Sequence, residues 1–234
     1  MSTPFRFKQF SVSQDRCAMK VNTDGVLLGA WAEVSGARNL LDIGTGTGVI
    51  ALMMAQRNPE AIVDAIEIDA DAFKQASENF LDSLWRERLY AYHSSLQNFK
   101  PEKKYDLIIS NPPYFVDDYK TENHQKNIAK HSVSLSYEEL ISGIHRLLSD
   151  SGEAFLVLPA FNLQSVEAYA SEKQLFITKV MEVCAVEGKA PYLALIRLNR
   201  EQRDYSKSTI VIQNEASLFT NEYKSLTKEF YLKF

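Results

Sequence analysis

The chain has 234 residues, of which 45% are hydrophobic and 24% charged, and its formal net charge is -4. These values are typical of a globular protein, and the length suits one large α/β domain with a small extension. The acidic balance argues against a protein that coats nucleic acid nonspecifically. No apolar run approaches the ~20 residues of a membrane span, and the N-terminus lacks the apolar core of a signal peptide. We therefore expect a cytoplasmic protein without membrane contact.

The cysteines and histidines predict neither disulfides nor a metal site. Cys17 and Cys184 lie far apart, in a chain large enough not to need a disulfide, so we interpret them as reduced thiols. The four histidines are scattered, and no Cys-x-x-Cys motif occurs.

Residues 1–37 are predicted to form an N-terminal extension. The alternation of Phe5, Phe7 and Phe10 indicates a strand-like start. Thr23 or Asp24 is expected to cap a short apolar helix from about Val26.

Residues 38–234 are predicted to form one domain, in which strands alternate with helices from residue 39 onward. Ser136 and Glu139 form a predicted capping box, and Ser151-Gly152 a predicted turn. A hairpin should join strands 176–186 and 192–198, and a further strand is expected near 209–212. The other predicted strands are 39–43, 62–66, 89–93, 105–110 and 153–158, and the other predicted helices are 49–57, 71–84, 136–148, 161–173 and 221–231. This order predicts a Rossmann-like, doubly wound, seven-stranded α/β sheet with an antiparallel hairpin at one edge.

A glycine-rich loop, Asp42-Ile-Gly44-Thr-Gly46-Thr-Gly48, separates the first strand of that domain from the first helix. Such a loop lets a ligand approach the backbone, and in open α/β sheets ligands bind at the carboxyl ends of the strands. Glu67 ends the next strand about twenty residues later, where its carboxylate can accept both ribose hydroxyls of an adenosine. Its neighbour Ile68 belongs to the same predicted cofactor site. Asp42 can either bind the cofactor or brace the loop, and Asp69 is expected to cap the following helix.

The run Asn111-Pro112-Pro113-Tyr114 follows the strand at 105–110 and predicts a site for a flat amino group. The Asn111 amide oxygen and a backbone carbonyl, most simply that of Pro112, can accept both hydrogens of an exocyclic amine. Consecutive prolines stiffen this backbone. Tyr114 offers a ring on which a base can stack, worth ~1–3 kcal/mol. The chemistry that fits is metal-free methyl transfer from S-adenosylmethionine to a planar nitrogen, which leaves S-adenosylhomocysteine.

Two modestly basic regions lie before the glycine-rich loop and after the run Asn111–Tyr114. The first holds Arg16 and Lys20, and the second Lys130 and His131. They indicate a docked polyanion at one face, although solvated surface charge is an equally good interpretation of each region alone. His131 can contact RNA, support the loop or have no function. The segment 114–135 has no periodicity, and loops of this length are usually functional or mobile.

Together these residues resemble the class I S-adenosylmethionine-dependent methyltransferases, in the branch that methylates amino groups. The segment 19–32, Met-Lys-Val-Asn-Thr-Asp-Gly-Val-Leu-Leu-Gly-Ala-Trp-Ala, is similar to its counterpart in bacterial tRNA(Val) adenine-37 N6-methyltransferases. The resemblance spans nearly the whole chain. It implies a tRNA substrate, cofactor contacts from the glycine loop and Glu67, and a position beside the cofactor for Thr23 and Asp24. Many relatives have an acid after the third strand, where Ser95 is the expected weaker substitute. We also expect a monomer.

Three alternatives remain open from the sequence. A protein glutamine N5-methyltransferase presents the same amide geometry, but such enzymes usually carry an N-terminal helical domain for which we expect no room here. Another RNA or DNA adenine N6-methyltransferase is possible, and no sizeable target-recognition domain for DNA is visible. A noncatalytic nucleotide-binding module would survive only if Asn111→Ala left methylation unchanged.

Overall fold

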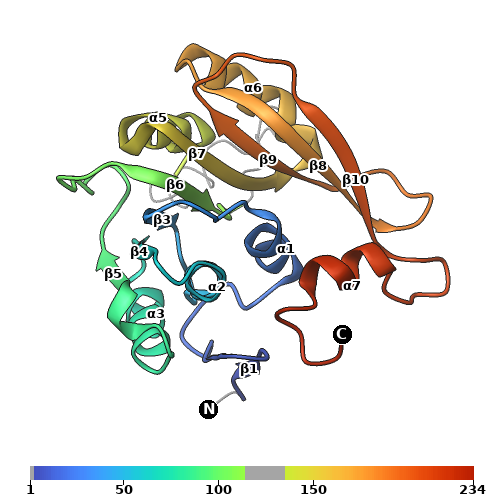
Figure 1. Cartoon of the computed structure of the whole chain (residues 1–234), viewed down its shortest axis with the longest axis horizontal. Coiled ribbons are helices and arrows are strands. Elements are labelled where there is room, and N and C mark those ends of the chain that lie inside the picture. The colour runs from blue at the N-terminus through green and yellow to red at the C-terminus, as the bar shows by residue number, and fades with distance from the viewer. Residues whose placement is uncertain (1–2, 114–134) are drawn as a thin grey trace, which may run out of the picture.

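The computed structural model describes residues 3–113 and 135–234. Figure 1 shows a central sheet with α1 (Thr23–Trp31), α2 (Val49–Arg57) and α3 (Ala70–Leu81) on one face, and α5 (Tyr137–Leu147) and α6 (Leu163–Glu172) on the other. The predicted α/β class, with a doubly wound sheet, is confirmed. A separate short hairpin, β1 (Phe5–Arg6) with β2 (Ser11–Val12), precedes the sheet.

Within residues 3–113 and 135–234, the sheet contains eight strands in the order β10-β8-β9-β7-β6-β3-β4-β5. Pairing is parallel from β5 to β7, whereas β9 runs antiparallel to both β7 and β8. The strand expected near 209–212 is longer, and it joins the sheet parallel to β8, so the sheet has one strand more than the predicted seven. The bounds are β3 (Asn39–Ile43), β4 (Ile62–Glu67), β5 (Leu89–His93), β6 (Tyr105–Ser110), β7 (Leu148–Pro159), β8 (Phe176–Val186), β9 (Leu193–Asn199) and β10 (Ser206–Gln213).

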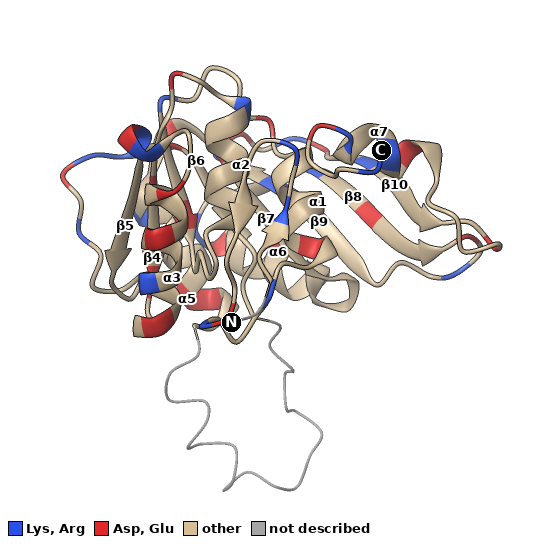
Figure 2. Cartoon of the chain, turned by 90° about the horizontal axis from the view of Figure 1, so that it is seen from below, with Lys and Arg blue, Asp and Glu red and all other residues tan. Residues whose placement is uncertain are grey.

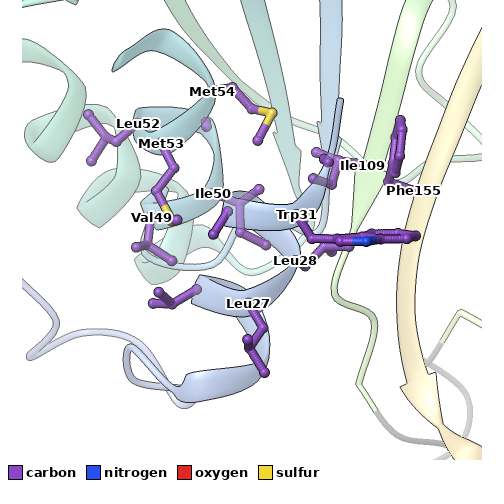
Figure 3. Close-up of a cluster of buried hydrophobic side chains, with 14 of the residues drawn as sticks. Leu27, Leu28, Trp31, Val49, Ile50, Leu52, Met53, Met54, Ile109 and Phe155 are labelled. Atoms are coloured by element: carbon purple, nitrogen blue, oxygen red, sulfur yellow. The ribbon is translucent and has the colours of Figure 1, made fainter. Parts of the chain in front are cut away.

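Two hydrophobic cores lie on the two faces of the sheet. In the first, α1 and α2 are buried on nearly all sides, because their sequences are apolar around the whole helix. Figure 3 shows Trp31 of α1 beside Phe155 of β7, and the two rings meet edge to face with centroids 5.6 Å apart. The second core packs α5 and α6 on the other face, and α5 begins with the predicted Ser136 capping box. Together the two cores hold in place the carboxyl ends of β3, β4 and β6, which carry the predicted site residues.

Several local predictions were wrong. Asn22, rather than Thr23 or Asp24, caps α1, because its Oδ1 accepts the backbone N–H of Gly25 at 2.9 Å. The turn at Ser151-Gly152 is instead part of β7, whose pairing with β6 shifts register there and absorbs the extra residues as an irregularity.

Element ends also differ from prediction. The helix expected to reach residue 84 stops at Leu81, and the C-terminal helix α7 (Asn221–Thr227) is shorter than the expected 221–231. A 3-10 turn, η2 (Ala160–Asn162), precedes α6, and another, η1 (Arg86–Arg88), precedes β5. Helix ends are the least determined feature of a hydrophobic pattern. None of these differences touches the strand ends that carry the predicted motifs.

Candidate functional site

A cavity of about 720 Å³ lies at the carboxyl ends of β3, β4 and β6. This volume falls within the range of small-molecule sites, and the position is where open α/β sheets bind ligands. Its lining includes the loop after β3, the end of β4, the segment after β5, the end of β6 and residues at the start of α1 and α5. An arm that we define as residues 13–20 supplies a further wall through Arg16, Cys17, Ala18, Met19 and Lys20. The cavity therefore collects residues far apart in the sequence.

The glycine loop makes its turn with left-handed backbone at three positions. Gly44, Gly46 and Gly48 have φ of 70°, 55° and 82°. Gly44 and Gly46 line the cavity, but Gly48 does not. A Cβ at Gly48 would lie 2.5 Å from Cε1 of Phe80, so this glycine serves the close packing of α2 against α3. The first two glycines face the predicted cofactor site, and the third supports it from behind.

Glu67 fixes the loop to the end of β4. Its Oε2 accepts the N–H of Gly46 at 2.9 Å, and its Oε1 accepts those of Ile68 and Asp69 at 2.8 and 2.9 Å. The side chain is 9% exposed and lines the cavity together with Ile68. A carboxylate has about four acceptor sites, so three backbone donors orient it and still leave capacity for a ligand hydroxyl. Asp69 is the N-cap of α3, as predicted.

Asp42 lies beneath the loop and does not line the cavity. The hydroxyl of Thr45 donates to its Oδ2 at 2.6 Å, so Asp42 braces the loop from below. Burial raises the pKa of this carboxyl to about 7, against the opposing effects of the Thr45 hydroxyl and the Ala51 backbone N–H. Of the two roles left open by the sequence, its contacts support the bracing one.

The end of β6 brings Asn111, Pro112 and Pro113 to the same cavity as Gly44 and Glu67. Ser110 joins β6 to β3, because its Oγ donates to the carbonyl of Ile43 at 2.8 Å. The predicted amine-gripping residues and the predicted cofactor residues therefore share one rim of the sheet. Tyr114, Lys130 and His131 lie outside the described residues, as does most of the predicted loop 114–135.

The start of α1 lies against Asn111. A Cβ at Gly25 would be 3.5 Å from Nδ2 of Asn111 and 3.4 Å from Oδ1 of Asn22. Asn22 and Gly25 line the cavity, whereas Thr23 and Asp24 do not. Thr23 is directed toward Tyr223 of α7. Burial, and secondarily the charge of Asp24, raises the pKa of Tyr192 to about 12.

The remaining predicted residues line the cavity from two sides. Ser95 follows β5, and its Oγ accepts the N–H of Asn98 at 3.3 Å. Arg16 and Lys20 come from the arm, and Arg16 forms an ion pair with Glu78 at 2.7 Å. In Figure 2 the ribbon positions of Lys and Arg are interspersed with those of Asp and Glu along the described chain. The positive charge near the cavity is therefore local.

Sequence reasoning missed several lining residues: Cys17, Ala18, Met19, Asn22, Gly25, Leu96, Gln97, Leu135 and Glu139 are the clearest. The arm carries no motif that signals its fold over the cavity. Among the described residues, no group of three or more His, Cys, Asp or Glu is arranged to hold a metal ion. No described helix is both long and apolar enough to cross a membrane.

Solved structures with the same fold are methyltransferases. A predicted O-methyltransferase from Agrobacterium tumefaciens superposes with a TM-score of 0.70 at 15% identity, covering 88% of this chain and 96% of that one. The ribosomal protein L11 methylase of Lactobacillus delbrueckii subsp. bulgaricus gives 0.58 at 17% identity, with 80% and 82% covered. At such identities the likeness shows the fold alone.

Sequence comparison is more specific. The model of the methyltransferase small domain matches residues 20–167. The tRNA1(Val) (adenine(37)-N6)-methyltransferase of Flavobacterium psychrophilum is 42% identical, with 98% of this chain and 99% of that protein covered. The protein of the same name from Bacteroides thetaiotaomicron is 43% identical, with 99% of each covered. The chain therefore belongs to the methyltransferase small domain family, among the relatives of the tRNA1(Val) (adenine(37)-N6)-methyltransferases.

Proposed function

We propose that this protein transfers a methyl group from S-adenosylmethionine to the exocyclic N6 of adenine 37 in tRNA1(Val), and releases S-adenosylhomocysteine. One observation carries the proposal: Asn111, Pro112 and Pro113 share a cavity with Gly44, Gly46 and Glu67. Relatives of nearly equal length that bear this activity in their names are 42–43% identical to the chain. In this proposal residues 1–37 are the extension beside the site, and residues 38–234 are the methyltransferase domain.

The cavity suits the proposed cofactor. Gly44 and Gly46 leave open space where a Cβ would stand, so a ligand can lie against the loop backbone. Glu67 is held with its carboxylate at the cavity wall, where it would accept a ribose hydroxyl. Ile68 and Ser95 line the cavity and would flank the adenine ring, to which the Ser95 hydroxyl offers a neutral hydrogen-bonding partner. When bound, S-adenosylmethionine supplies a methyl group activated by its sulfonium.

The end of β6 would hold the amine that is methylated. An adenine N6 lone pair is delocalised into the ring, which makes the nitrogen a poor nucleophile. The Asn111 amide oxygen and the Pro112 carbonyl would accept its two hydrogens, raise electron density on nitrogen and direct the lone pair out of the ring plane. The methylated nitrogen is cationic and sheds its proton readily, so no strong base is needed. Catalysis would rest on positioning and charge complementarity.

The RNA would approach across the arm and the end of β6. Arg16 and Lys20 line the cavity at its arm wall, where they would meet phosphates. Pro113 would pack against the target base, and we assign the stacking ring to Tyr114 and further RNA contacts to Lys130 and His131. A tRNA substrate and two free cysteines support a cytoplasmic location. We also propose that the protein acts as a monomer, which size-exclusion chromatography with light scattering can test.

The function is tested with purified protein, labelled S-adenosylmethionine and unmodified tRNA1(Val) transcript. We expect one methyl group per tRNA, located at N6 of adenine 37 by nuclease digestion and mass spectrometry. A transcript with guanosine at position 37 is the matched control and should take no label. Label on a different adenine would refute the position. Label on a glutamine of an added release factor, with none on RNA, would instead support the N5-glutamine alternative.

A further inference from the structure

The arm lacks a regular element of its own, yet it forms one wall of the cavity. Residues 16–20 line the cavity, and all but residue 20 lie before the segment that the family model matches. Such a wall must be held by contacts from elsewhere, because an irregular segment gains little from its own backbone hydrogen bonds. The contacts that hold it come from α3.

Two buried amides stand on one face of α3, one helical turn apart. Gln75 is 1% exposed and Asn79 is 4% exposed, among the buried apolar residues Ala72, Ala76 and Phe80. Burying a primary amide costs free energy unless its donors and acceptor are satisfied. The position of these amides therefore depends on the groups that they bind.

Asn79 binds both the start of the arm and the glycine loop. Its Oδ1 accepts the N–H of Ser13 at 2.9 Å, and its Nδ2 donates to the carbonyl of Ser13 at 2.9 Å. The same Nδ2 donates to the carbonyl of Thr47, in the glycine loop, at 2.8 Å. One side chain thus joins the start of the arm to the loop against which the cofactor would lie.

Further contacts fix the arm beyond Ser13. Gln75 accepts the N–H of Arg16 at 3.4 Å, and the guanidinium of Arg16 pairs with Glu78 of α3 at 2.7 Å. Gln14 accepts the N–H of Val21 at 2.9 Å, which closes the arm on itself just before α1. Because Asn79 is buried and binds both backbone groups of Ser13, its loss should release the arm more than the loss of the exposed Arg16–Glu78 pair.

We propose that Asn79, assisted by Gln75, is a positioning residue of the cofactor site, which holds the arm as a wall of the cavity and keeps it in register with the glycine loop. The inference rests on the proposed function in that it takes S-adenosylmethionine as the occupant of the cavity. Asn79 does not itself line the cavity, so it acts through the arm and through Thr47.

The test compares Asn79→Ala with the wild-type chain by two measurements. Isothermal titration with S-adenosylmethionine and S-adenosylhomocysteine should show affinity about tenfold weaker, the effect of losing a buried hydrogen-bonding partner. Trypsin should cut after Arg16 and Lys20 faster in the variant, as followed by mass spectrometry. In the wild-type chain, S-adenosylmethionine should slow these two cuts. At saturating cofactor, kcat for tRNA should stay within about twofold of wild type, because the reacting groups are intact.

Ser77→Ala is the matched control, because its hydroxyl donates only to the carbonyl of Phe73 within α3. It should change neither the affinity nor the cuts. If Asn79→Ala does not fold, Gln75→Met, which conserves volume, carries the test, with an expected loss of about threefold. A folded variant with wild-type affinity and wild-type cutting after Arg16 and Lys20 overturns the inference. Failure of the wild-type chain to bind S-adenosylmethionine would instead refute the proposed function.

Discussion

One sheet contains both the parallel strands β3, β4 and β6 and the antiparallel pair β8 and β9. The two groups differ in what lies at the ends of their strands. The three parallel strands end at the same edge, so the loop after β3, the carboxylate of Glu67 and the amide of Asn111 converge on one cavity. Strands β8 and β9 are joined by a short turn through Gly188, and the side chains of these strands that face inward pack in the hydrophobic core. The comparison shows how strand direction decides where polar groups can gather.

The two regions are also stabilised by different interactions. The β8–β9 half is held by buried aliphatic side chains such as Leu195 and Ile196. The cavity half contains buried polar groups, among them Asp42, Glu67, Gln75 and Asn79, each tied to neighbouring backbone or hydroxyl groups. Changes in the cavity half should therefore alter ligand affinity or catalysis, whereas changes in the hairpin half should alter only stability. The predictions for Asn111, Glu67 and Leu195 test this division, and the one for Asp42 tests the charge state of a buried polar group in the cavity half.

The largest effect is expected for Asn111→Ala. Removing one of two acceptors for the target amine should lower kcat by about 10²–10³-fold, as for the loss of a preorganised polar partner. The affinity for S-adenosylmethionine should change much less. Single-turnover methylation of tRNA1(Val) measures the rate, and Asn39→Ala, at the amino end of β3 and so away from the cavity, is the control. A rate within threefold of wild type would remove Asn111 from the catalytic site.

Glu67→Gln should follow in size. The neutral amide can accept at only one atom, so at least one of the N–H groups of Gly46, Ile68 and Asp69 would lose its partner. We expect cofactor affinity to fall roughly thirtyfold, in line with hydrogen bonds to charged groups. Calorimetric titration measures it. Glu60→Gln, near the amino end of β4, should bind like wild type, and an equal loss in both variants would contradict a specific role for Glu67.

Asp42→Asn should change the pH dependence of stability. The pKa of Asp42 is raised from 3.8 to about 7 in the folded protein. The folded state therefore holds the proton more tightly than the unfolded state, and the free energy of unfolding should decrease as pH rises from about 4 to about 7. The slope attributable to this group is at most about 1.4 kcal/mol per pH unit, and Asp42→Asn should remove it.

Urea unfolding of both proteins at pH 5, 6, 7 and 8 measures this difference. The two stability curves should diverge between pH 5 and pH 7 and run parallel above it. Parallel curves throughout would show that Asp42 is ionised in the folded protein across this range.

Leu195→Ala in β9 should have the smallest effect on function. Leu195 is fully buried, so its truncation should cost about 2–5 kcal/mol of unfolding free energy. Cofactor affinity, measured well below the melting temperature, should stay within twofold of wild type. A large loss of affinity in the folded variant would break the division between the two halves of the sheet.

The sequence by itself determined the alternation of strands and helices and the three motifs of the site. Apolar runs and caps such as Ser136 and Asp69 are local signals, so they predicted the elements they belong to. The residues at 44, 46, 67 and 111 could be placed together because parallel strands share a carboxyl edge. That argument needs only the order of strands, which the chain order of the motifs already indicates.

The tertiary structure alone decided which atoms face the cavity. Gly48 packs against Phe80 and does not line the cavity. Asn22 lines the cavity, whereas Thr23 and Asp24 do not. The arm folds over the cavity because Asn79 binds both the backbone N–H and the carbonyl of Ser13, which lies sixty-six positions earlier in the chain. Hydrogen bonds between such distant residues leave no period or motif in the sequence, since their partners are set by the packing of α3 against the sheet.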